Sequence, residues 1–173
     1  MNRTTALLIL VSVILIAVVL ATFFLSQDKK NQESFNIYYS FGIGEKSVLD
    51  TGNNFFVKDM VCNSSKQYDF ILNDDEMNEI YDAIIENDLL NIKDNFTENC
   101  DSSGNCLEVT PLSTSTLIIN LNGQKKTIKY SANYFDENDL ELKKLMGVQK
   151  IIQDIIDKKE KELNIEQPIC GYL

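Results

Sequence analysis

The sequence predicts an α+β domain: an antiparallel sheet of element order βββ-α-ββ-α with two helices on one face, preceded by one N-terminal transmembrane helix. Three patterns predict it. An uncharged apolar run fills residues 6–25, strand-like patterns recur in five later segments, and two segments repeat apolar residues every three to four positions. Alternation of apolar and polar residues is typical of strands with one buried face, and the longer spacing is typical of amphipathic helices. We therefore divide the chain into an anchor at 1–25, a polar tether at 26–34 and a domain at 35–173.

Residues 6–25 predict a membrane anchor. A helix of this length spans about 30 Å, the thickness of the hydrocarbon core of a bilayer. The run is longer than the apolar part of a cleaved signal peptide, and it ends in Phe23, Phe24 and Leu25, where signal peptidase requires small side chains. We expect an uncleaved anchor that contacts the lipid bilayer through residues 6–25. Cleavage stays open as the alternative.

Three strands are predicted in the first half of the domain. Within residues 35–41, Phe35, Ile37, Tyr39 and Phe41 occupy alternate positions, which puts Tyr38 on the opposite face. Residues 54–62 follow a loop at 50–53 and predict the second strand. Alternation returns in residues 68–72 and predicts the third.

Capping residues and apolar spacing together predict the two helices. Asn73 can cap a helix, and Glu76 completes a capping-box pattern three residues later. The helix after it ends near Asn87 and has an apolar face made of Met77, Ile80, Tyr81, Ile84 and Ile85. The second helix begins at Asp139 and ends near Leu163. We expect the acidic segment 136–141 to cap that helix rather than to hold a cation.

Residues 114–121 and 124–130 predict a β-hairpin. Asn122 and Gly123 between them are the residue types that a two-residue type I′ turn prefers. In the resulting register one face of the hairpin is apolar and the other is polar, with Ile118 as the apolar exception on the polar side. One face is therefore expected to be buried and the other exposed.

This order of elements resembles that of uncharacterised bacterial and archaeal membrane-anchored or lipoprotein-type extracytoplasmic domains. The resemblance covers residues 35–173 and lies in the segment 72–76 that opens a helix, in Ile80 and Tyr81 on that helix, and in the later hairpin and helix. It implies a location outside the cytoplasm and brings no activity or functional residues. The lipoprotein members carry a lipid-modified cysteine near the N-terminus, whereas the first cysteine here is Cys62.

The four cysteines predict two disulfides in an oxidising compartment. All of them follow the apolar run. Of the three pairings, we favour Cys100–Cys106, which closes a short turn-rich loop, with Cys62–Cys170, which ties the C-terminal tail to the second strand. The other two pairings stay open. Cysteine-only zinc sites use more closely spaced pairs than these, so no metal is expected.

Composition excludes several classes of function. With no His, a Ser-His-Asp triad, a Cys-His pair and a His-containing zinc site are impossible. The net charge of −10, with 15 Lys and one Arg against 26 acidic residues, argues against a nucleic-acid partner. The motifs G-x-S-x-G, G-x-x-x-x-G-K-[ST] and G-x-G-x-x-G are absent, and the one S-x-x-K match, Ser26 to Lys29, lies in the polar tether, where no pocket is expected. No cofactor is expected.

These observations favour a membrane-anchored, single-pass protein whose C-terminal domain lies outside the cytoplasm and binds a ligand or partner, such as another envelope protein. The candidate patch comprises Tyr38 and one of Phe55 and Phe56, the aromatic residues that alternation places away from the core. Asn63 and Asn95 stand in glycosylation sequons. The alternative function is an anchored or secreted hydrolase that uses paired carboxylates. An enzyme is the less favoured class.

Overall fold

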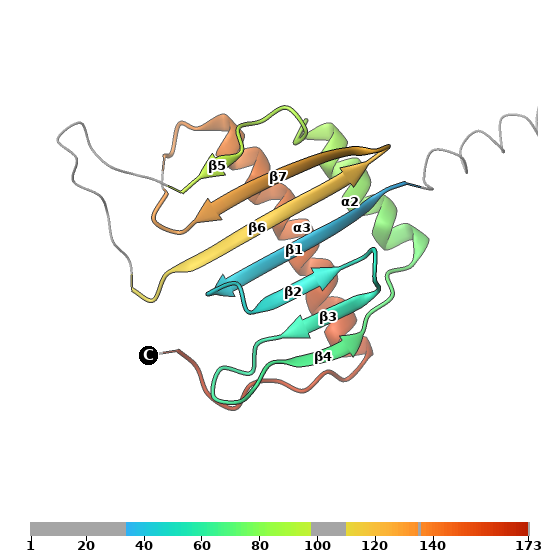
Figure 1. Cartoon of the computed structure of the whole chain (residues 1–173), viewed down its shortest axis with the longest axis vertical. Helices are drawn as coiled ribbons and strands as arrows, with labels where there is room; N and C mark the ends of the chain where they lie inside the picture. The colour runs from blue at the N-terminus through green and yellow to red at the C-terminus, as the bar shows by residue number, and fades with distance from the viewer. Residues whose placement is uncertain (1–33, 98–109, 135, 173) are drawn as a thin grey trace, which may run out of the picture. The chain divides into compact units, whose positions relative to one another are not determined.

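The computed structural model describes residues 34–97, 110–134 and 136–172. The elements along the chain are β1 (Asn36–Ile43), β2 (Ser47–Asp50), β3 (Phe55–Lys58), β4 (Lys66–Asp69), α2 (Asp74–Glu86), β5 (Asn95–Phe96), β6 (Ser113–Leu121), β7 (Gln124–Ser131) and α3 (Leu140–Glu162). The domain is α+β, as the sequence predicts. Figure 1 shows the strands side by side in one sheet.

The strands form a seven-stranded sheet in the order β4-β3-β2-β1-β6-β7-β5. Every neighbouring pair is antiparallel except β5 and β7, which run parallel. The expectation of a purely antiparallel sheet is therefore wrong, and the sheet is mixed. β5 consists of Asn95 and Phe96 alone, and two residues cannot show the alternation from which strands are predicted.

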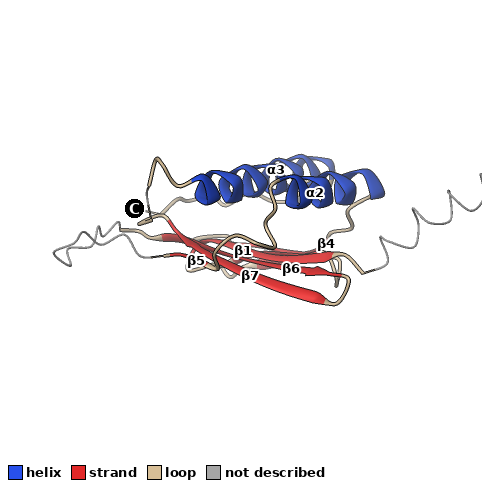
Figure 2. Cartoon of the chain, turned by 90° about the horizontal axis from the view of Figure 1, so that it is seen from above, coloured by secondary structure: helices blue, strands red, loops and turns tan. Residues whose placement is uncertain are grey.

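Both described helices cover the same face of the sheet (Figure 2). The strands turn their apolar side chains toward these helices and form the core with them. Its largest fully buried side chains include Phe56, Phe70, Phe96, Ile37, Leu49, Leu117, Ile119 and Ile128. None of the described helices covers the opposite face, which we call the uncovered face.

Both helices begin with the predicted caps. The backbone N–H of Glu76 donates to Asn73 Oδ1 at 2.9 Å, and the N–H of Asn73 donates to Glu76 Oε2 at 2.9 Å, which completes the capping box. Asp139 Oδ1 accepts from the N–H groups of Glu141 at 2.9 Å and Leu142 at 3.0 Å. These bonds satisfy donors that the first turn of a helix leaves free.

The predicted anchor and nearly all of the tether, residues 1–33, lie outside the described residues, as do Cys100 and Cys106. The transmembrane helix expected at 6–25 is therefore not shown. In the part of the chain that the structure describes, no helix is long and apolar enough to cross a bilayer.

The C-terminal tail after α3 runs back beside the β4 edge of the sheet (Figure 1). Cys62 and Cys170 lie with their Cα atoms 6.2 Å apart and form a disulfide-compatible pair, as the favoured pairing predicts. Lys66 and Glu166 form an ion pair along the same stretch. The tail therefore flanks the edge strand that would otherwise offer free backbone groups to another chain.

A buried ion pair joins the sheet to α3. Lys58 Nζ lies 2.5 Å from Glu160 Oε2, and each side chain is 11% exposed. Lys58 also donates to Gln167 Oε1 at 2.7 Å, and Gln167 Nε2 donates to the same Glu160 oxygen at 3.2 Å. The three groups satisfy one another and hold β3, α3 and the tail together.

Replacing Lys58 with Met should lower the free energy of unfolding by about 3 kcal/mol, because Glu160 then stays buried without its cation. We expect the lower end of the usual range, since Gln167 still donates to Glu160. The double variant Lys58→Met/Glu160→Met should recover most of the loss, because an apolar pair needs no compensating charge. Urea unfolding measures both. A double variant no more stable than the single one would contradict this role for the pair.

Candidate functional site

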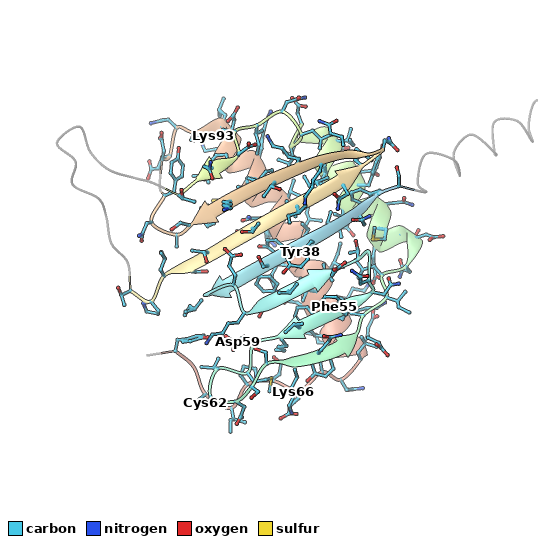
Figure 3. The ribbon with its side chains drawn as sticks, in the orientation of Figure 1. Tyr38, Phe55, Asp59, Cys62, Lys66 and Lys93 are labelled. Carbon is cyan, nitrogen blue, oxygen red and sulfur yellow. A yellow bond between two sulfur atoms is a disulfide. The ribbon has the colours of Figure 1, made fainter. Side chains whose placement is uncertain are left out.

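One row of side chains crosses the uncovered face from β7 to β4. The strand register sets opposite one another, in order, Thr127, Ile118, Tyr38, Asp50, Phe55 and Asp69, which we call the central row. Tyr38, Phe55 and Ile118 are partly exposed, whereas their neighbours along each strand point into the core. Figure 3 labels Tyr38 and Phe55 on this face.

Phe55 and Phe56 lie on opposite sides of the sheet. Phe56 is 1% exposed, and its ring centroid lies 5.1 Å from that of Phe70 and 6.4 Å from that of Phe41. Its inclusion in the candidate patch is therefore corrected: Phe56 belongs to the core, and Phe55 is the member of the pair on the uncovered face. The sequence left this open because successive residues of a strand alternate and both are phenylalanine.

Polar groups next to the central row are bonded to one another. Glu45 lies in the turn after β1 with φ of 53°, accepts a hydrogen bond from the Ser40 hydroxyl, and accepts another from Thr116 Oγ1 at 3.2 Å. Asn120 Nδ2 donates to Asn36 Oδ1 at 2.8 Å. The face therefore has Ile118, Tyr38 and Phe55 near its centre, with Asp50 between Tyr38 and Phe55, and it is bordered by polar groups that already have partners.

Unpaired charges of opposite sign lie toward opposite sides of the uncovered face. Lys125 and Lys129 project from β7, on the same side of that strand as Thr127, and Asp69 projects from β4. No ion pair of these three side chains is found within the described residues, and all three residues are exposed. Asp50 of β2 lies between these two sides of the face, and its Oδ1 accepts a hydrogen bond from the backbone N–H of Asn53 at 2.9 Å. The face is basic at β7 and acidic at β4.

The two sequon asparagines are both exposed. Asn63 follows Cys62 in the loop between β3 and β4, and Asn95 begins β5 beside Lys129. Neither lies in the central row. Of the predicted site residues, the structure brings Tyr38 and Phe55 into one row and Cys62 next to Cys170, and it separates Phe56 from the patch.

A polar cluster lies at the start of α3. Lys93 Nζ donates to Asp139 Oδ2 and to the Tyr134 hydroxyl, each at 2.6 Å, and that hydroxyl donates to Asp139 Oδ2 at 2.6 Å. Lys93 also lies 4.7 Å from the centroid of the Tyr134 ring. The hydrogen bonds from Lys93 and then Tyr134 hold the pKa of Asp139 well below its usual value. Through this cluster, Lys93 in the loop between α2 and β5 is joined to Asp139, the N-cap of α3.

The Asp139 cluster predicts a stability that depends on pH. A carboxylate whose pKa is lower in the folded protein stabilises above its unfolded pKa of about 4, and this contribution is lost as pH falls toward the folded value. Asp139→Asn keeps a capping side chain but loses the charge, so it should be less stable than the wild type at pH 7 by up to about 1 kcal/mol. Urea unfolding should show this difference shrinking below about pH 4. A difference that stays constant down to pH 2.5 would argue against the ion pair.

Two cavities lie away from the uncovered face. One, of about 440 Å³, lies between β7 and the start of α3 and is lined by Tyr130, Tyr134, Asp136, Glu137, Leu142, Lys143 and Met146. The other, also about 440 Å³, is a groove between the helices lined by Asp75, Asn78, Glu79, Asp82, Ala83, Glu86 and Asn87 of α2 and its C-terminal end, and by Ile151 of α3. Its carboxylates all come from one helix, whereas a carboxylate-dependent hydrolase needs two acids on either side of its substrate.

No group of three or more acidic, cysteine or histidine side chains suited to hold a metal ion occurs in the described ranges. The uncovered face is therefore the candidate functional site, since it brings predicted aromatic residues from β1 and β3 together with Ile118 from β6. No protein-family model matches this chain, and no curated protein is significantly similar to it.

Proposed function

We propose that residues 35–173 form an extracytoplasmic binding domain, held at the membrane by residues 6–25, which receives a protein partner on the uncovered face. The observation that carries the proposal is the central row, with Tyr38, Phe55 and Ile118 partly exposed on a face that neither described helix covers. Antiparallel sheets with one solvated face usually turn polar side chains to water. Apolar and aromatic residues grouped on such a face favour an interface, since aromatic residues are enriched there.

The shape of the surface favours a protein as the partner. Small molecules bind in concave sites that enclose most of their surface, and both cavities described above lie elsewhere. A sheet face with side chains at regular spacing offers broad contact to another folded surface, as when two sheets pack about 10 Å apart. The helix groove offers carboxylates from one wall only, which gives the hydrolase alternative less support.

The location rests on two independent features. Residues 6–25 have the length and composition of a membrane-spanning helix, and Cys62 with Cys170 forms a pair suited to an oxidising compartment. An amine-reactive reagent that cannot cross membranes should therefore label the domain's exposed lysines, such as Lys150, on intact cells. Labelling that appears only after the cells are opened would overturn the extracytoplasmic location.

The binding proposal is tested with a photo-crosslinking residue at two matched positions of the full chain. Ile118 lies on the uncovered face, and Ile85, 45% exposed, lies on α2 on the other side of the molecule. Crosslinked products should form from position 118 at least tenfold more efficiently than from position 85. Equal yields at both positions, or no product from position 118, would overturn the proposal.

A further inference from the structure

We propose that the partner on the uncovered face is a second copy of this chain, docked face to face about a two-fold axis that runs parallel to the strands between β1 and β2. This inference rests on the proposed binding function and names its partner. It follows from the distribution of charged and apolar side chains across the sheet.

The charges of the uncovered face complement a second copy of themselves. A two-fold axis along the strands between β1 and β2 exchanges the two sides of the sheet, so that β7 of one copy faces β4 of the other. Because Thr127 and Asp69 are the ends of one row, the operation sets Asp69 of one copy opposite Thr127 of the other, between Lys125 and Lys129. Both symmetry-related contacts then pair opposite charges.

The same operation brings the apolar side chains together. It sets β6 of one copy over β3 of the other, so that Ile118 meets Phe55, and it sets β1 over β2, so that Tyr38 lies opposite Asp50. The operation overlays six of the seven strands, about 4.8 Å apart, and each overlaid pair includes a four-residue strand about 13 Å long, so the overlap is on the order of 400 Å². This is about half of the roughly 800 Å² that each partner buries in a standard interface, which is the range of weak interfaces.

The alternative two-fold axis in the plane of the interface does not fit. An axis perpendicular to the strands keeps each strand over its own copy, which sets the lysines of β7 over each other and Asp69 over Asp69. Like charges placed opposite one another at an interface oppose binding. The charge pattern therefore selects the axis parallel to the strands.

The test uses two charge variants of the full chain in mild detergent. Lys125→Glu/Lys129→Glu sets the two new glutamates of one copy against Asp69 of the other, and Asp69→Lys sets the new lysine against Lys125 and Lys129. Sedimentation should show a wild-type dimer and should show each variant alone dissociating at least tenfold more readily. Mixed together, the two variants should form a 1:1 heterodimer within about threefold of the wild-type affinity, because each carries the charges that the other needs. The same charge change on α3, Lys150→Glu/Lys158→Glu, should leave the dimer unchanged.

Three results would overturn the inference. The wild type could be monomeric at every concentration, neither face variant could change the dissociation of the dimer, or the two variants could fail to associate when mixed. The photo-crosslink at position 118 separates this failure from failure of the binding function. A crosslink to a different protein would overturn the second copy as partner and keep the binding face. No crosslink at all would overturn both.

Discussion

Replacing Phe56 with alanine should lower the free energy of unfolding by about 3–5 kcal/mol, while the same change at Phe55 should cost about 1 kcal/mol or less. Phe56 is 1% exposed and packs against Phe70 and Phe41, so alanine leaves a cavity in the core. Phe55 is the adjacent residue of β3 but lies on the uncovered face, where truncation leaves no buried cavity. Urea unfolding monitored by circular dichroism measures both.

The pair also separates folding from binding. Phe55→Ala should weaken association of the folded protein several-fold, because it removes an aromatic contact from the central row, whereas Phe56→Leu should leave association unchanged while it destabilises the core. Equal losses of stability at positions 55 and 56 would show that both rings are buried. The description of an uncovered face would then be wrong.

Removing the Cys62–Cys170 disulfide should destabilise the domain by about 4 kcal/mol. The two cysteines are 108 residues apart in sequence, and a crosslink over a loop of that length restricts the unfolded chain strongly. Cys62→Ser/Cys170→Ser should therefore unfold at a much lower urea concentration. Its loss should exceed that of Cys100→Ser/Cys106→Ser, because the predicted loop between those two residues is short.

A thiol titration provides the control for the disulfide. Wild-type protein denatured without reductant should show no reactive thiol if both predicted disulfides are present, and the Cys62→Ser/Cys170→Ser variant should show none either. Four reactive thiols in the wild type would contradict the disulfide, and the extracytoplasmic location would lose the support that it draws from Cys62 and Cys170.

Elements fixed by local chemistry could be predicted from the sequence. Asn73 and Glu76 cap α2 as expected, and Asn122 with Gly123 joins β6 to β7 in the expected register. β2 and β5 could not be predicted, since the first has four residues and the second has two. The position of β1 beside β6 was also beyond prediction, because this pairing joins residues about 80 positions apart and no local signal specifies it.

The candidate site could be predicted only in pieces. Alternation placed Tyr38 away from the core, and the hairpin register identified Ile118 as an apolar residue on a polar face. That these two residues are direct neighbours depends on the order of strands in the sheet, which the sequence does not specify. The same holds for the separation of Lys125 and Lys129 from Asp69, since charges on different strands acquire relative positions only when the sheet forms.

Binding through the uncovered face is tested most directly by hydroxyl-radical footprinting of the full chain. The protein is oxidised at one concentration below and one above that at which the proposed dimer forms. Oxidation of Tyr38 and Phe55 should fall several-fold at the higher concentration. Oxidation of Met146, 49% exposed on α3, and of Leu140, 70% exposed at its start, should not change. Protection of the residues on α3, with Tyr38 and Phe55 oxidised equally at both concentrations, would contradict binding through this face.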